Sequence, residues 1–232
     1  MVENEKVYIY FHICAINNWV DIVRNIFTKF KEYGVYDKVD EVRVFLLGKK
    51  QYTGSAIFSI DKKIKIINVC NYAMVYERFT LESLKKDSMR ENFKVFYLHS
   101  KGVSLKNQGK EAKESIRNWT NKMLDLSLKK MDNVLNKLDE YDTLGCNFKD
   151  TEVFGAHFSG NFWWSKSQYI RKLGSIQSDY YGPEKWILSL KDRKVLSIEL
   201  SNHTPDDVNF MERTIMHETK EIKRTNKIHY IW

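Results

Sequence analysis

Residues 95–102 read VFYLHSKG, an apolar run that stops abruptly at three polar residues and a glycine. The branched and aromatic side chains of its first half favour a buried strand. Such a strand presents His99, Ser100 and Lys101 at its carboxyl end. Because open α/β sheets bind ligands beyond the carboxyl ends of their strands, this position indicates a functional edge.

Three apolar runs upstream of this stretch also predict strands, at Val7–Cys14, Glu41–Leu47 and Ile64–Cys70. An apolar stripe from Trp19 to Phe30 predicts a helix after the first run, and a second helix is expected from about Tyr76 to Arg90. Strands that alternate with helices imply crossover connections. The sequence therefore predicts an α/β fold with a mixed, mostly parallel, Rossmann-like sheet that has helices on both faces.

The rest of the chain continues the alternation. We expect one long helix, a short strand, an aromatic stretch, two further helices and a last strand, at Glu111–Leu138, Thr143–Phe148, His157–Trp164, Ser167–Leu173, from Pro183 onward, and Lys194–Leu200. A polar, basic tail follows.

Composition indicates one globular domain over residues 1–232. Hydrophobic residues make up 43% of the chain, which excludes disorder, and the sequence has only 2 Pro and 10 Gly with no linker-like stretch between its halves. The net charge of +8 suits an anionic partner and equally suits a solvated, lysine-rich surface.

The cysteines and the first residues of the chain indicate the cellular compartment. Cys14, Cys70 and Cys146 are odd in number and lie far apart, which favours reduced thiols. The opening residues MVENEK lack the layout of a signal peptide, and the longest apolar-rich run is too short to cross a bilayer. We therefore expect a cytoplasmic protein with at most peripheral membrane contact.

Neither GxGxxG nor GxxxxGK[ST] occurs, so a nucleotide would be held without these two fingerprints. The segments YLHSKGVS, LGCN and HFSGNFWWSKSQYI, with ICAINNW, YGVYDKV and YERFTLESL upstream, resemble a family of small GT-A glycosyltransferases of large DNA viruses and bacterial surface-polysaccharide clusters. The resemblance covers nearly the whole chain, and it implies a nucleotide-sugar-binding half at residues 1–100 and an acceptor-binding half with the basic tail at residues 101–232. It implies a single-domain GT-A fold and transfer of a sugar from a nucleoside diphosphate sugar, with a UDP-sugar expected, to a glycan acceptor; for a viral protein this would take place in the host cytoplasm.

The resemblance also implies a donor site at the strand ends. Cys14, Ala15 and Asn17, after the first strand, would approach the nucleobase and ribose. The strand-end segment His99, Ser100, Lys101 and Gly102 would meet the diphosphate. A His and a Ser that cap the strand, followed by a solvated Lys, are the alternative.

Most GT-A enzymes hold a divalent metal with Asp-x-Asp at this strand end, where the present chain has His99-Ser100-Lys101. The departure puts the metal in doubt. His99 and His203 are the candidate ligands for Mn²⁺ or Mg²⁺. Lys101 offers a fixed positive charge that reduces the need for one, and His203 has a structural role as its alternative.

For the acceptor side the resemblance implies His157, Ser159, Asn161 and Trp163, through hydrogen bonds to sugar hydroxyls and stacking on a sugar ring. Adjacent tryptophans in a strand face opposite sides, so Trp164 is expected in the core.

An inverting transfer needs a carboxylate that deprotonates the acceptor hydroxyl. The resemblance implies a base at the start of the helix after the aromatic strand, which is Glu184 here, with Asp179 as the second choice. The alternative is structural, because the helix dipole favours a glutamate in a first helical turn whatever its function.

Two other functions compete. The positive charge and the many aromatic residues also suit a nucleic-acid-binding module, but no zinc, helix-turn-helix or RNP pattern occurs. A GT-A domain that binds glycans without catalysis is the other alternative, because the acidic pair is missing. The resemblance and the strand-end position favour the enzyme, with no nucleic acid as its partner.

Overall fold

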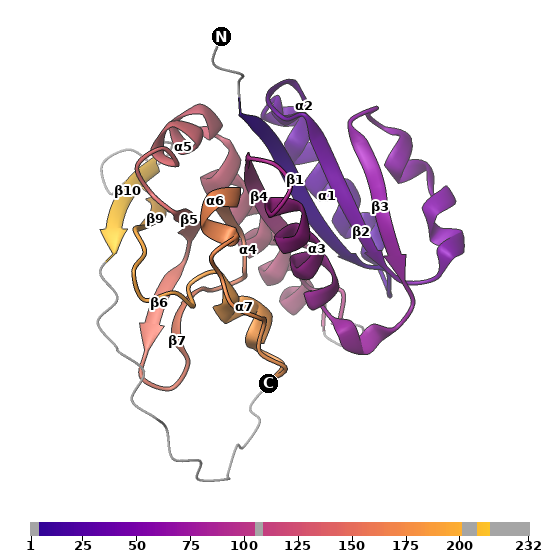
Figure 1. Ribbon diagram of the computed structural model, residues 1–232. Helices are drawn as coiled ribbons and strands as arrows, with labels where there is room; N and C mark the ends of the chain where they lie inside the picture. Colours follow the sequence, from indigo (N-terminus) through magenta and orange to yellow (C-terminus); the bar gives the residue numbers. More distant parts are fainter. Residues whose placement is uncertain (1–4, 105–108, 201–207, 214–232) are drawn as a thin grey trace.

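The computed structural model describes residues 5–104, 109–200 and 208–213, and within these the strands of the main sheet number eight (Figure 1). Their order across the sheet is β10-β9-β5-β8-β4-β1-β2-β3. The strands are β1 (Lys6–Cys14), β2 (Glu41–Leu47), β3 (Ile64–Cys70), β4 (Phe93–His99), β5 (Thr143–Cys146), β8 (Trp163–Lys166), β9 (Val195–Leu200) and β10 (Val208–Arg213). A separate hairpin consists of β6 (Phe148–Thr151) and β7 (Gly155–Phe158).

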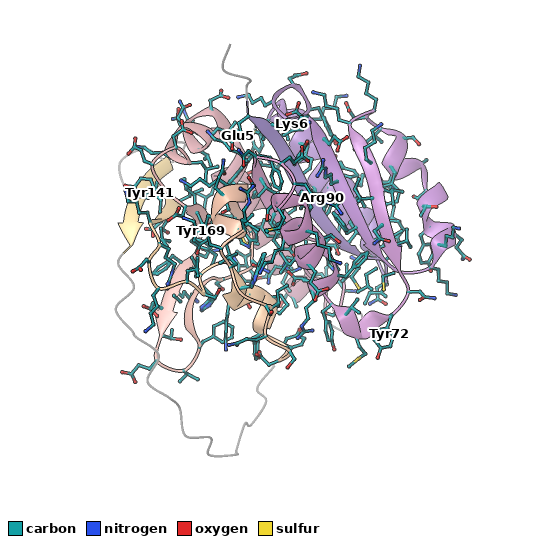
Figure 2. The ribbon with its side chains drawn as sticks, in the orientation of Figure 1. Glu5, Lys6, Tyr72, Arg90, Tyr141 and Tyr169 are labelled. Atoms are coloured by element: carbon teal, nitrogen blue, oxygen red, sulfur yellow. The ribbon has the colours of Figure 1, made fainter. Side chains whose placement is uncertain are left out.

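The first half of the sheet is parallel, as predicted. β3, β2, β1 and β4 are joined by parallel pairs, so their carboxyl ends meet at one edge. β1 begins at Lys6 at the top of Figure 2, and Tyr72, just after β3, lies at the opposite, lower edge. β8 is antiparallel to both β4 and β5, and β10 is antiparallel to β9, so the sheet as a whole is mixed.

Helices cover both faces of the sheet (Figure 1). The face behind the sheet carries α1 (Trp19–Glu32), α4 (Lys110–Leu128) and α5 (Met131–Lys137), and the front face carries α3 (Arg78–Ser88), α6 (Ser167–Ile170) and α7 (Gly182–Trp186). The remaining helical pieces are short: α2 (Val35–Lys38) and the 3₁₀ turns η1 (Lys50–Gly54), η2 (Ala56–Ser59) and η3 (Ala73–Val75). No helix in the described ranges combines the length and the apolar composition that crossing a membrane requires.

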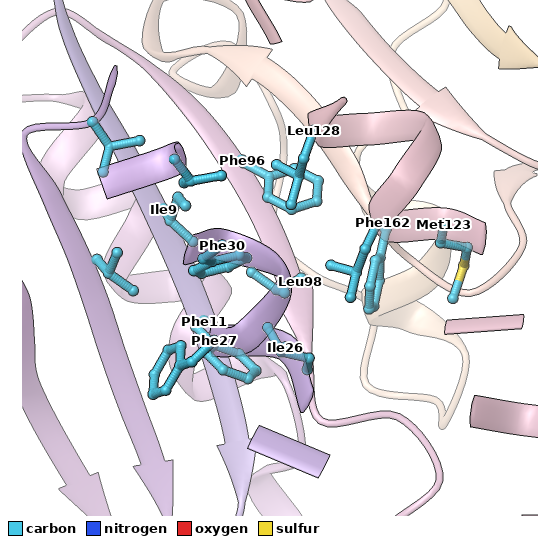
Figure 3. Close-up of a cluster of buried hydrophobic side chains, with 14 of the residues drawn as sticks. Ile9, Phe11, Ile26, Phe27, Phe30, Phe96, Leu98, Met123, Leu128 and Phe162 are labelled. Carbon is cyan, nitrogen blue, oxygen red and sulfur yellow. The ribbon is translucent and has the colours of Figure 1, made fainter. Parts of the chain in front are cut away.

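Alternation along the strands divides the core into two clusters. Ile9 and Phe11 of β1 pack toward α1, where Phe11 meets Phe27 at a ring-centroid distance of 5.8 Å (Figure 3). Tyr8 and Tyr10 point to the other face, toward α3. Because each such side chain contributes about 1.5–3 kcal/mol when fully buried, the two clusters fix the strand register.

The paired tryptophans confirm the expected alternation. Trp163 stacks on Tyr97 in the front cluster at 4.9 Å, and Trp164 stacks on Phe96 in the rear cluster at 5.0 Å. Both tryptophans belong to β8, whose backbone pairs with β4.

Four features differ from the sequence prediction. The long helix breaks at Lys130, whose φ of −117° and ψ of 44° are not helical, and the apolar spacing conceals the break because Leu128 and Met131 on either side are both buried. The strand expected to end at Phe148 is divided at Asn147, where φ is 55°. The aromatic stretch forms two strands, β7 and β8, and part of the tail pairs as β10.

Candidate functional site

Hydrogen bonds tie the ends of β1 and β4 into one edge. The Ser100 amide donates to the His12 carbonyl (2.9 Å), and the Ser100 hydroxyl accepts from the Cys14 amide (2.9 Å). The Asn17 side chain donates to the Val103 carbonyl (2.6 Å), which joins the loops that follow the two strands. Ser100 is buried, so it fixes this edge and does not present its side chain to solvent.

The other residues expected on the donor side differ in accessibility. Ala15 is buried, and its amide bonds to the Leu47 carbonyl (2.8 Å), so it positions the loop through its backbone. Cys14 is half-buried, and burial raises the pKa of its thiol, which therefore stays protonated near neutral pH. Gly102 has a φ of 91°, and a Cβ there would lie 2.9 Å from the side chain of Ile116 on α4.

A carboxylate that the sequence prediction did not single out lies beside His99. One Glu77 oxygen accepts from the Tyr97 hydroxyl (2.6 Å) and the Asn161 amide (2.7 Å), and the other lies 3.5 Å from His99 Nδ1. Burial acts to raise the pKa of Glu77, but the charges of His99 and His12 and these hydrogen bonds lower it below its usual range. Glu77 therefore stays ionised. Its only sequence signal was its place in YERFTLESL, before α3.

Two histidines flank this carboxylate. His99 Nε2 donates to the Gly160 carbonyl (3.1 Å), which can only accept, so this nitrogen carries the proton. Burial lowers the pKa of His99, and the Glu77 charge opposes that shift. His12, also missed, is buried with Nδ1 2.8 Å from the Thr80 hydroxyl, and burial lowers its pKa to about 4. The sequence signal that could have identified His12 is its place as an ionisable residue inside the apolar run VYIYFHIC.

The two predicted base candidates have different surroundings. Glu184, in the first turn of α7, accepts the Gly160 amide at 3.1 Å. Gly160 thus contacts both Glu184 and His99. Asp179 is exposed and accepts the Tyr181 amide (2.9 Å), so its carboxylate stabilises the turn before α7.

Lys101 completes what we call the edge cluster: Glu77, His99, Lys101 and Glu184. Its ammonium lies 4.5 Å from the centre of the Trp119 ring. Burial lowers the pKa of Lys101, whereas the charges of Glu184 and Glu77 raise it. The ammonium therefore packs on an aromatic face and lies within range of the charges of two carboxylates.

Lys101 also borders a cavity of about 1010 Å³ between α1 and α4. Five basic and two acidic side chains line this cavity, which makes it favourable for an anion: Arg24, Lys101, Lys110, Lys113 and Arg117 against Asp21 and Glu114. The Thr120 hydroxyl, also in the lining, is buried and finds no hydrogen-bond partner within the described residues. A buried polar atom without a partner marks a place for a ligand atom or water.

Most of the residues expected on the acceptor side are buried and form hydrogen bonds within the protein. Asn161 is buried, with its amide on Glu77 and its oxygen on the Trp163 indole (2.8 Å). Trp163 has no exposed surface, so it positions Asn161; the expectation that it stacks on a sugar does not hold, because the faces of β8 are both covered. His157 is buried too, and its Nδ1 donates to the Gly155 carbonyl (2.9 Å). Ser159 is partly exposed, and its amide bonds to the Asn147 carbonyl.

The donor set does not complete a metal site in the described part of the chain. His99 and Glu77 supply two neighbouring ligand atoms, but no group of three or more His, Cys, Asp or Glu side chains has a suitable arrangement there. Nδ1 of His99 and one Glu77 oxygen already face each other, and the other Glu77 oxygen accepts two hydrogen bonds. His203 lies outside the described residues.

The structure is an α/β fold with a cluster of charged side chains at the carboxyl edge of its sheet. Residues 10–204 match the family model described as a domain of unknown function (DUF8361), and the chain belongs to this family. A comparison with curated proteins finds no match.

Proposed function

We propose that the protein is a glycosyltransferase of GT-A type that transfers a sugar from a nucleoside diphosphate sugar, expected to be a UDP-sugar, to a glycan acceptor. The observation that carries this proposal is that Lys101 takes part in both the cavity and the edge cluster. Its side chain lines the cation-rich cavity and also interacts with the carboxylates of Glu77 and Glu184. A cationic pocket adjoining a carboxylate pair suits an anionic leaving group on one side and a hydroxyl nucleophile on the other.

The cavity would hold the donor. Its volume of about 1010 Å³ accommodates a nucleotide sugar. As the glycosidic bond breaks, the diphosphate gains negative charge, and Lys101, which lines the cavity and interacts with both carboxylates, would stabilise that charge. Losing one preorganised stabiliser of developing charge costs on the order of 3 kcal/mol.

Glu184 would act as the base in an inverting transfer. One oxygen is held by the Gly160 amide, and the other has no hydrogen bond to any described residue. It takes the proton of the acceptor hydroxyl, whose oxygen forms the new bond to the anomeric carbon. The bond from that carbon to the diphosphate breaks, and the diphosphate leaves with the electron pair.

Glu77 has a different role in this scheme. Its lowered pKa makes it a weak base, and its hydrogen bonds to Tyr97 and Asn161 leave little room for a proton. We infer that Glu77 fixes the orientation of His99. The step uses the fixed charges of the chain and is not routed through a metal, because the described residues do not complete a metal site.

Calorimetric titration with UDP-, GDP- and dTDP-sugars, with and without Mn²⁺, tests donor binding. We expect one of these donors to bind and a labelled form to yield product with a glycan acceptor. Glu184→Gln keeps the oxygen that accepts the Gly160 amide, so donor binding should persist while transfer falls about 10²- to 10⁴-fold. Asp179→Asn, the matched carboxylate-to-amide control, should transfer nearly as well as the wild type.

Failure of all three donors to bind would refute the proposal. Donor binding without transfer would favour a GT-A domain that binds glycans and has lost catalysis. Steeply salt-dependent binding to single-stranded nucleic acid would favour the third function, although the largest aromatic side chains are mostly buried in the core.

A further inference from the structure

Several aromatic rings gather in contact with one another on the surface. Tyr180 is 60% exposed, Tyr181 47% and Tyr76 37%, which is unusual for side chains of this size. Tyr180 meets Tyr76 at a centroid distance of 5.5 Å and Tyr181 at 5.1 Å, and Phe154 meets Tyr181 at 4.9 Å. All three contacts are edge-to-face, so the rings present both faces and edges to solvent. We call these four residues the aromatic platform.

The platform adjoins the edge cluster. Tyr76 directly precedes Glu77, and Tyr181 is the residue before α7, whose first turn carries Glu184. The charges of Glu77 and Glu184 both help to raise the pKa of Tyr180, after burial and the neighbouring Tyr181. Tyr76 has a φ of 46°, a conformation that bulky residues rarely adopt and that is found preferentially at functional sites.

The segment that carries two of the rings is held rigidly. Arg78 donates to the carbonyls of Gln177 (3.2 Å), Ser178 (2.6 Å) and Asp179. A Cβ on Gly182 would lie 2.1 Å from the Gln177 carbonyl oxygen, so the turn is closed tightly. Rings fixed in this way lose little entropy when a ligand stacks on them.

We propose that the aromatic platform binds a pyranose ring of a neutral glycan acceptor, an inference that rests on the proposed function and adds the acceptor site to it. The nearby carboxylates of Glu77 and Glu184 disfavour an anionic partner such as nucleic acid. They do accept hydrogen bonds from hydroxyl groups. An occupant with an apolar C–H face and hydroxyl groups at its rim matches both features, and a pyranose has both.

The position of the platform would deliver the acceptor hydroxyl to the base. Phe154 stands at the tip of the β6–β7 hairpin, and α7 packs beside β7, so the hairpin and the helix border the same surface (Figure 1). Lys185 Nζ lies 4.6 Å from the centre of the Phe154 ring and covers one side of it. Tyr181, which packs on Phe154, directly precedes α7, and Glu184 lies in the first turn of that helix.

An array of printed neutral oligosaccharides, followed by calorimetry with the strongest binder in free form, tests the proposal. Tyr180→Ala and Tyr181→Ala should each weaken oligosaccharide binding about tenfold, because each removes a stacking face. Tyr180→Phe keeps the ring and should stay within about twofold of the wild type. Tyr72→Ala removes a tyrosine that is 63% exposed and outside the platform, and should change nothing.

Absence of oligosaccharide binding, or unchanged binding by both alanine variants, would overturn the platform. The affinity for the nucleotide sugar separates the two proposals. If the tyrosine variants lose oligosaccharide binding but the wild type binds no nucleotide sugar, the proposed binding role of the platform is supported and the proposed enzymatic function is refuted. If the wild type transfers the sugar and the variants bind oligosaccharide normally, the enzymatic function is supported and the binding role of the platform is refuted.

Discussion

Acid should destabilise the protein through one buried histidine. His12 is 3% exposed, and its pKa is lowered from 6.5 to about 4 because burial disfavours the charged ring. The unfolded chain protonates this residue near pH 6.5, whereas the folded chain resists protonation until about pH 4. Between these values the unfolded state binds more protons, so the free energy of unfolding falls as the pH falls.

The size of the effect follows from the shift. One pKa unit corresponds to about 1.4 kcal/mol, so His12 alone should remove about 2–3 kcal/mol of stability between pH 7 and pH 4.5. Urea unfolding at the two pH values measures this loss, which corresponds to a change of roughly 1 M in the midpoint. In His12→Asn the amide can occupy the place of Nδ1 near Thr80, and the loss should shrink by that amount.

A second variant separates the charge from the hydrogen bond. Thr80→Val keeps the imidazole but removes its partner, so it should be less stable at both pH values and retain the steep acid dependence. Glu77 and His99, which also face His12, remain in both variants and contribute equally. Equal losses of stability in His12→Asn and the wild type would refute the assignment.

Three further outcomes are expected. Gly160→Ala should cost at least about 1–3 kcal/mol in urea unfolding, because its φ is 100° and a Cβ would lie 2.5 Å from Met123 Sδ, whereas Gly174→Ala, with no atom within 4 Å of its Cβ, should be nearly neutral. Trp163→Phe keeps a ring against Tyr97 but removes the indole donor to Asn161, so unfolding free energy should fall by about 1–3 kcal/mol; a neutral result would contradict the hydrogen bond. Lys101→Ala should weaken nucleotide-sugar binding or transfer about 100-fold in the calorimetric and labelled-donor assays, and wild-type values in both would remove Lys101 from the donor site.

The strands were predictable because their signal is local. The apolar runs at Glu41–Leu47 and Ile64–Cys70 have the boundaries that the structure has. The first is an inner strand whose second half is buried and needs a continuous apolar segment, whereas the second is a largely exposed edge strand that its β-branched residues made recognisable. The break at Lys130 was not predictable from spacing, because the apolar period continues across it.

The site divides in a similar way. The carboxyl edge with His99 and Lys101 could be predicted, because the strand pattern alone determines where a parallel strand ends. The role of Glu77 could not be predicted, because it depends on a contact with Asn161, far away in the chain. The burial of Trp163 could not be predicted either, because it depends on which elements cover the faces of β8. Exposed tyrosines in a polar segment likewise carry no signal until the fold brings them together.

The central position of β8 has a consequence for how the protein is made. This strand pairs with β4 on one side and β5 on the other, although it follows β4 by more than sixty residues. A growing polypeptide can therefore assemble β1 to β4 early, while the Gly160 turn just before β8, which holds Glu184 and His99, awaits a late insertion into the middle of the sheet. Synthesis that stops before β8 would leave the contacts of Gly160 with Glu184 and His99 unformed, so the edge cluster would be completed only late in synthesis.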